Sequence, residues 1–125
     1  LRTPLANAKG VVLNQSSMMS YVPTIAYGVT KAALNAMTYG MAQAFASDNI
    51  RVNGIAPGYI DTPAAHANGT EATRAYLLNM QAVKTTGSTD DIVKLARFLA
   101  SDDARFITGE TISCDGGSTM KGWRA

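Results

Sequence analysis

The chain has 125 residues, of which 46% are hydrophobic and 16% charged, and its formal net charge is +2. This length and composition are typical of one globular domain and exclude a disordered chain. The lysines and arginines are scattered, which argues against a nucleic-acid partner. No apolar stretch reaches the roughly 20 residues that span a bilayer, so we expect no membrane partner. The single cysteine, Cys114, excludes an internal disulfide and, with no leader pattern, favours a cytoplasmic protein.

The first residues indicate that the chain is a piece of a longer domain. It begins at Leu1 rather than at a methionine, and the apolar run 11–13 follows soon after. We therefore expect a chain cut within a domain. A processed or tagged small protein is the alternative interpretation.

Taken in chain order, the first half of the sequence predicts strand, helix and strand. The β-branched run 10–15 predicts a strand buried on both faces. Apolar residues at spacings of three and four then predict a helix over 26–47. Residues 50–56 predict a second strand, which Pro57 and Gly58 end.

The second half predicts two helices and a last strand. A helix over 70–81 is less regular and is expected to turn Tyr76, Leu77 and Met80 inward. Residues 89–100 predict an amphipathic helix with Thr89 as its cap. Its buried stripe is expected to be Ile92, Leu95, Ala96 and Leu99. Residues 111–114 predict a strand before a glycine turn.

This alternation predicts an α/β protein with a doubly wound parallel sheet. Long connections between strands imply right-handed crossovers. In such sheets ligands bind at the carboxyl ends of the strands. Ser16, Ser17 and the segment 57–62 follow two strands directly, and Tyr27 starts the helix after the first. We therefore expect a site where these three segments converge.

Tyr27 and Lys31 are the most informative pair in the chain. On a helix, residues four apart lie on one face, so the phenol and the ammonium are neighbours. An ammonium so close favours the ionised phenolate and makes the phenol a proton donor and acceptor near neutral pH. An ordinary exposed helix pair is the alternative when the spacing is taken alone.

Four segments together carry a family resemblance. They are 11–17, Tyr27-x-x-x-Lys31, 50–62 and 107–117, in this order over nearly the whole chain. With them the chain resembles the second half of a short-chain dehydrogenase/reductase. The resemblance implies a Rossmann-type fold in which residues 1–125 are the C-terminal part of a single NAD(P)-binding domain. The N-terminal cofactor-binding half is absent.

The resemblance also implies roles for individual residues. Ser17 would hydrogen-bond the substrate oxygen, Tyr27 would transfer the proton, and Lys31 would assist Tyr27 and bind the nicotinamide ribose. The backbone from Pro57 through Gly58 to Ile60 would line the nicotinamide, and Thr62 would reach its carboxamide or the phosphates. Candidates for an apolar substrate wall are Met18, Met19, Tyr21 and Tyr59.

Two features depart from the family pattern. Ser17 lies ten residues before Tyr27, a loop about three residues shorter than in most members, which leaves open whether Ser16 or Ser17 is the functional serine. The glycine-rich phosphate loop, the residue that selects NAD or NADP and the catalytic asparagine belong to the first half. No G-x-G-x-x-G occurs in the chain.

Three further residues have competing interpretations. Thr62 precedes Pro63 and is either a helix cap or a cofactor contact. His66, the only histidine, is interpreted as a surface residue, and one histidine with one cysteine predicts no metal site. Cys114 is expected to be buried rather than reactive.

The resemblance therefore predicts an NAD(P)-dependent oxidoreductase that interconverts a small-molecule alcohol and a ketone or other carbonyl. It also implies a homo-oligomer, a tetramer or a dimer. A truncated, inactive half-domain that serves as an interaction module is one alternative. Epimerisation on the same scaffold is a weaker one. Residues 63–86 are expected to form a lid over the substrate.

Overall fold

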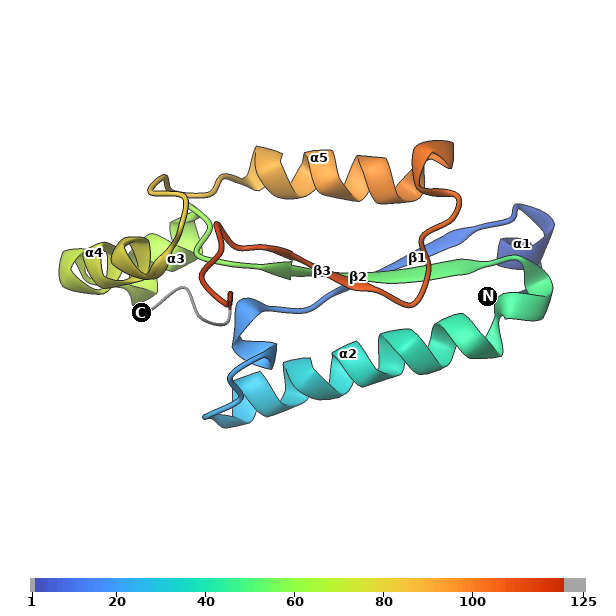
Figure 1. Ribbon diagram of the computed structural model, residues 1–125, viewed down its shortest axis with the longest axis horizontal. Helices are drawn as coiled ribbons and strands as arrows, with labels where there is room; N and C mark the ends of the chain where they lie inside the picture. Colours follow the sequence, from blue (N-terminus) through green and yellow to red (C-terminus); the bar gives the residue numbers. More distant parts are fainter. Residues whose placement is uncertain (1, 121–125) are drawn as a thin grey trace.

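The computed structural model describes residues 2–120 and has an α/β architecture. A three-stranded parallel sheet in the order β1-β2-β3 contains β1 (Val11–Gln15), β2 (Arg51–Pro57) and β3 (Thr111–Cys114). Helix α2 (Ala26–Ala44) covers one face of the sheet, and α5 (Thr89–Ala100) covers the other (Figure 1). The predicted strands, the two long helices and the parallel sheet are confirmed.

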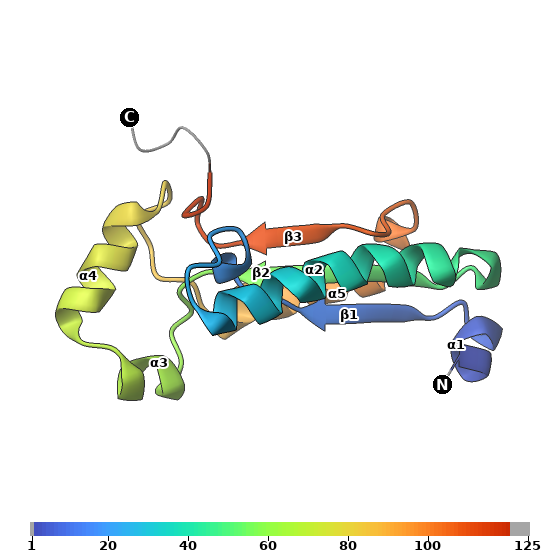
Figure 2. The same cartoon turned by 90° about the horizontal axis from the view of Figure 1, so that it is seen from below.

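Short elements complete the fold. The helices α1 (Arg2–Asn7) and α3 (Pro63–Asn68) precede β1 and follow β2, and α4 (Glu71–Met80) lies at the end of the sheet near α3 (Figure 2). Single 3-10 turns are η1 (Met18–Ser20), η2 (Ala46–Asp48) and η3 (Asp102–Ala104). Helix α2 ends at Ala44, earlier than expected, because the chain tightens into η2 and Asn49 then adopts a left-handed conformation with φ of 56°.

Burial of the strands follows their position in the sheet. The central strand β2 has five buried residues in succession, and Val52 and Ala56 are fully inaccessible to solvent. The prediction that the first strand is buried on both faces is wrong, because its residues are only half-buried or exposed. Within the described residues β1 pairs with β2 alone, so it is an edge strand.

The two crossovers have opposite hands. Strand order runs in one direction across the sheet, while α2 and α5 lie on opposite faces. The β1–α2–β2 connection is right-handed, so the β2–α5–β3 connection is left-handed (Figure 2). The expectation of right-handed crossovers is therefore wrong for the second one. Its path includes α3 and α4 before α5.

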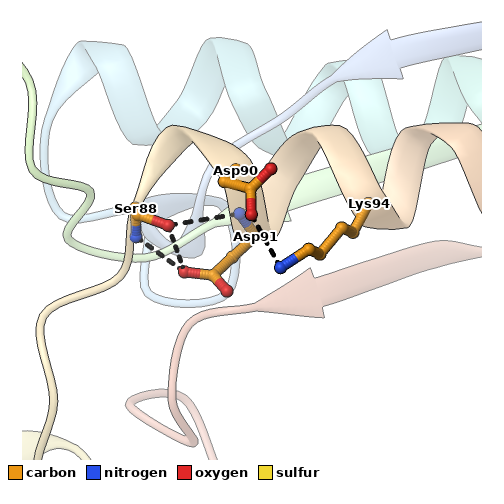
Figure 3. A network of polar contacts seen from close by, with 4 residues as sticks. All are labelled: Ser88, Asp90, Asp91 and Lys94. Carbon is orange, nitrogen blue, oxygen red and sulfur yellow. Dashed lines mark hydrogen bonds and ion pairs between the residues drawn. The ribbon is translucent and has the colours of Figure 1, made fainter.

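Helix α5 begins with a capping box. Ser88 Oγ accepts a hydrogen bond from the Asp91 backbone N–H at 3.3 Å, and the Ser88 N–H donates to the Asp91 carboxylate at 2.8 Å (Figure 3). Thr89 is the first helical residue, so its prediction as the cap is wrong by one position. The predicted stripe is confirmed, since Ile92, Leu95, Ala96 and Leu99 pack in one cluster with Ile55.

Two hydrophobic clusters flank the sheet. On the α2 side Ala42, Ile50 and Val52 are buried together, and on the α5 side Ile55, Leu99 and Ala104 are buried together. The expectation for α4 is corrected in part. Tyr76 is 63% exposed rather than turned inward, and α4 lies beyond the end of the sheet (Figure 2).

Candidate active site

A cavity of about 620 Å³ opens at the carboxyl ends of β1 and β2. Its volume is that of a site for a small molecule. One wall comes from the end of β1 and the start of α2, another from the segment after β2, and a third from the start of α5. Its lining residues are Gln15, Ser16, Ser17, Met18, Tyr27, Pro57, Gly58, Tyr59, Ile60, Thr62, Ala64, Ala65, Thr89, Ile92 and Val93.

Most of the predicted site residues line this one cavity. Ser17 and Tyr27 lie in its wall together with the whole segment from Pro57 to Ile60 and with Thr62. Three segments far apart in the sequence thus meet at one edge of the sheet. Lys31 is the exception, since it is not among the residues that line the cavity.

Lys31 lies next to Tyr27 on the same face of α2. Its Nζ is 5.6 Å from the centroid of the Tyr27 ring, and it donates a hydrogen bond to the Gln15 carbonyl at 2.8 Å. The bond to Gln15 ties α2 to the last residue of β1 and holds the ammonium beside the ring. An ammonium has three donors, and the Gln15 carbonyl accepts from one of them.

The two neighbouring serines have different surroundings. The Ser16 hydroxyl is directed toward α2, where it donates to Asn35 Oδ1 and lies 3.3 Å from the Lys31 carbonyl oxygen. Ser17 Oγ accepts a hydrogen bond from the Met19 N–H at 3.2 Å, as the cap of η1. Accepting that bond leaves the Ser17 hydroxyl proton for an oxygen in the cavity. The geometry thus favours Ser17 over Ser16.

The segment after β2 is shaped by contacts within the protein. A Cβ on Gly58 would lie 2.5 Å from the Asp115 Cα, so close packing against the chain after β3 accounts for the glycine. Thr62 caps α3, with its Oγ1 accepting from the Ala65 N–H at 3.1 Å. The helix-cap interpretation of Thr62 is therefore confirmed, and its contact with a cofactor stays a prediction.

A second, smaller cavity adjoins the first. It has a volume of about 280 Å³, and Met18 lines both cavities. Its wall combines the loop before α2 with α4 and is mainly apolar, with Met18, Met19, Val22, Thr24, Tyr76, Leu77, Met80, Ser118 and Thr119. Two of the four candidates for an apolar substrate wall, Met18 and Met19, lie here, and Tyr59 lies in the larger cavity. Tyr21 lines neither of the two and donates to the Thr111 carbonyl at 3.1 Å.

The remaining chemistry-bearing residues have structural surroundings. His66 is exposed, and its Nε2 lies 2.5 Å from the Asp61 carboxylate. Over residues 2–120 no group of His, Cys, Asp and Glu side chains could hold a metal ion. Burial raises the pKa of the Cys114 thiol, and the negative charges of Asp91 and Asp115 add to this effect. This direction disfavours the reactive thiolate, as expected.

Sequence reasoning missed the contribution of α5 to the cavity. Thr89, Ile92 and Val93 line it, although the sequence suggested only a cap and a core stripe there. Residues 63–86 lead from the carboxyl end of β2 to α5, so α5 has to begin at the same edge of the sheet as the site. This order of segments was the signal available in the sequence. None of the helices in the described part of the chain is long and apolar enough to cross a membrane.

Comparison with known proteins agrees with this architecture. A family model described as enoyl-(acyl carrier protein) reductase matches residues 2–119. The 7alpha-hydroxysteroid dehydrogenase of Bacteroides fragilis is 44% identical over 94 residues, covering 75% of this chain and 36% of that protein. Glucose 1-dehydrogenase 2 of Bacillus subtilis is 35% identical over 117 residues, covering 91% and 45%.

Superposition on solved structures also finds dehydrogenases and reductases. A 7 alpha-hydroxysteroid dehydrogenase complexed with NADH and 7-oxo glycochenodeoxycholic acid superposes with a TM-score of 0.88 and 32% identity, covering 93% of this chain and 47% of that one. A 3-oxoacyl-[acyl-carrier protein] reductase from Brucella melitensis superposes with a TM-score of 0.85 and 31% identity, covering 94% and 46%. The chain spans about half the length of these relatives or less.

The fold and the cavity at the strand ends are those of a Rossmann-type α/β protein. The match over residues 2–119 shows that the chain belongs to the short-chain dehydrogenase/reductase family.

Proposed function

We propose that the intact protein is an NAD(P)-dependent oxidoreductase that interconverts an alcohol and a carbonyl. One observation carries this proposal. The hydroxyl groups of Ser17 and Tyr27 belong to residues in the wall of one cavity, and Lys31 lies beside the Tyr27 ring. The relatives named as dehydrogenases and reductases support the reaction class, and the neighbour solved with NADH supports the cofactor class.

The residues at the cavity fit a nicotinamide cofactor. The larger cavity combines a mostly apolar wall over Pro57, Tyr59 and Ile60 with hydroxyl and backbone polar groups, as a flat ring with an amide requires. We propose that the backbone of Pro57, Gly58 and Ile60 lines the ring and that Thr62 and Lys31 donate to its polar substituents. The cofactor would supply the hydride.

The protein's own part in the reaction is to hold the substrate oxygen and to move one proton. In the reducing direction, Ser17 donates a hydrogen bond to the carbonyl oxygen and Tyr27 transfers its phenolic proton to that oxygen. The Lys31 ammonium stabilises the phenolate that remains. In the oxidising direction, Tyr27 takes the proton back.

We propose a substrate with an apolar body. Met18 joins the larger cavity to the apolar one, so a substrate whose oxygen reaches Ser17 can rest against Met19, Leu77 and Met80. Methionine side chains are flexible and polarisable and adapt to irregular apolar surfaces. A compact polyol with a higher kcat/KM than a large apolar ketone would contradict this proposal.

Two further proposals concern assembly and location. The α2 residues Met37 and Tyr39 are 50% and 59% exposed, which supports a homo-oligomer, a dimer or a tetramer, built on the outer face of α2. Light scattering tests it, and a monomer at micromolar concentration would contradict it.

A free thiol at Cys114 supports a cytoplasmic location, which cell fractionation tests.

Tyr27→Phe in the intact protein tests the proposed function. The substitution removes the phenolic oxygen and keeps the ring beside Lys31, so carbonyl reduction should fall by at least about 100-fold. The dissociation constants for NADH and NADPH should change little. Full activity of the Tyr27→Phe variant would overturn the assignment.

A further inference from the structure

A chain of hydrogen bonds connects α2 with both sides of Ser17. Asn35 lies one turn beyond Lys31 on the helix, and its Oδ1 accepts a hydrogen bond from the hydroxyl of Ser16. Its Nδ2 donates to Ser20 Oγ at 2.9 Å. Ser20 Oγ in turn donates to the backbone carbonyl of Ser17 at 2.7 Å. One side chain thus holds the residue before Ser17 and the residue that fixes Ser17's own backbone.

In this hydrogen-bond network each donor faces an acceptor. Ser16 is 2% and Ser20 7% exposed, so an unsatisfied hydroxyl at either position would be costly. The Asn35 amide offers an acceptor to one serine and a donor to the other from a single short stem. An apolar residue at this half-buried helix position would satisfy neither.

Packing alone gives the loop before α2 little support. Val22 and Ile25 are 56% and 57% exposed, so the connection from η1 to α2 buries few apolar side chains. The position of Ser17 relative to Tyr27 then depends on polar contacts. The Asn35 network reaches Ser17 from the helix that carries Tyr27 and Lys31, in addition to the bond from Lys31 to the Gln15 carbonyl.

We propose that Asn35 is a positioning residue for the reaction. It sets the distance and angle between the Ser17 hydroxyl and the Tyr27 phenol by tying η1 to α2. This proposal rests on the proposed function. A displacement of about 1 Å in such a site can lower the rate about 100-fold, so loss of the network should lower turnover.

The test uses Asn35→Leu in the intact protein. We expect kcat to fall about 10- to 100-fold, with the dissociation constant of NADH or NADPH unchanged. In a Ser17→Ala background the same substitution should cost little more, because both act through the Ser17 hydroxyl. Ser20→Ala removes the middle link by a smaller change and should lower kcat in the same way if Asn35→Leu does not fold.

Thr38→Val is the matched control. It removes another hydrogen bond between β1 and α2, from Asn14 Nδ2 to Thr38 Oγ1 at 3.0 Å, with no link to Ser17. We expect it to lower the melting temperature and to leave kcat unchanged. An equal loss of kcat in Thr38→Val would overturn the proposal. It would also be overturned if the fold loss of kcat in the double variant Asn35→Leu/Ser17→Ala equalled the product of the two single losses.

The two proposals fail in different ways. If Tyr27→Phe is fully active, the proposed function is wrong. If Tyr27→Phe is inactive but Asn35→Leu and Ser20→Ala turn over at the unmodified rate, only the positioning role of Asn35 is wrong.

Discussion

Ser16 and Ser17 are adjacent, but their hydroxyl groups have different partners. We predict that Ser17→Ala lowers kcat about 100-fold, because it removes a donor to the reacting oxygen. It should also lower stability, because the Met19 N–H loses its acceptor. Ser16→Ala should lower the free energy of unfolding by about 1–3 kcal/mol, because it leaves the Asn35 amide oxygen without its donor. It should lower kcat less than Ser17→Ala does, because it loosens the Asn35 network but keeps the Ser17 hydroxyl. Steady-state kinetics and urea unfolding of both variants check this. The opposite pattern would assign the substrate contact to Ser16.

Lys31 is expected to act on both the proton and the cofactor. We predict that Lys31→Ala lowers kcat and raises the KM for NADH or NADPH by about tenfold or more, because it removes a charge from beside the phenol and a donor from the ribose. Lys94→Ala is the control, since Lys94 is exposed on α5 and pairs with Asp90 at 2.6 Å. An unchanged KM for the cofactor in Lys31→Ala would refute the second role.

At the scale of residues, short sequence patterns were enough to predict most of the residues that line the cavity. Ser17 and the segment 57–60 lie directly after strand ends, and they line the cavity. The Asn35 network was missed, because Asn35 and Ser20 are 15 positions apart and meet only through packing of η1 on α2. Hydrogen bonds between side chains of distant residues leave no periodic signal.

At the scale of elements, the start of α5 shows how a cap supports the cavity wall. Ser88 caps α5, and Thr89 is both the first residue of α5 and part of the wall. We predict that Ser88→Ala lowers the free energy of unfolding by about 1 kcal/mol, because it removes the cap. Urea unfolding measures this. Thr89→Ala, which leaves the capping box intact, should cost less, and an equal loss would contradict the assignment of Ser88 as the cap.

The same cap predicts a dependence of stability on pH. The hydrogen bonds from the Ser88 hydroxyl and backbone N–H hold the pKa of Asp91 below its ordinary value of 3.8. A lowered pKa in the folded state means that this stabilisation is complete above that value and is lost as the pH falls through the lower folded value. Unfolding measured between pH 2 and 6 should show a smaller acid loss in Ser88→Ala than in the unmodified protein. Identical acid profiles would argue against this linkage.

Long elements with a clear period were predictable, and short or peripheral ones were not. The helices α1 and α3 have 6 residues each, too few to display a hydrophobic period. The half-buried state of β1 could not be predicted because it depends on which strands flank it. Tyr76 fits a helical stripe on α4, but it is 63% exposed and lines the open second cavity, which the hydrophobic period alone does not predict.

At the scale of the whole molecule, the fold brings the site to one edge of the sheet. The helices α3 and α4 lie at this edge, beyond the carboxyl end of β2, and α1 lies at the opposite end (Figure 2). The left-handed crossover through α5 could not be predicted from the general rule of handedness. The segment between β2 and α5 contains α3 and α4, and α5 lies on the opposite face of the sheet from α2.

The chain contains Ser17, Tyr27 and Lys31, to which we assign proton transfer as a proposal, and it spans about half the length of its relatives. The glycine-rich phosphate loop of the resemblance is absent from its 125 residues. Activity, substrate and cofactor preference are therefore properties to be measured on the intact protein.

Transfer of deuterium from the nicotinamide C4 of labelled NADH or NADPH to the substrate carbon is the most direct test of the central claim. In the intact protein we predict that the alcohol product carries one deuterium at the former carbonyl carbon, and that Tyr27→Phe abolishes this transfer. Conversion of substrate without incorporation of the label would contradict the account and would favour epimerisation or another reaction on the same scaffold.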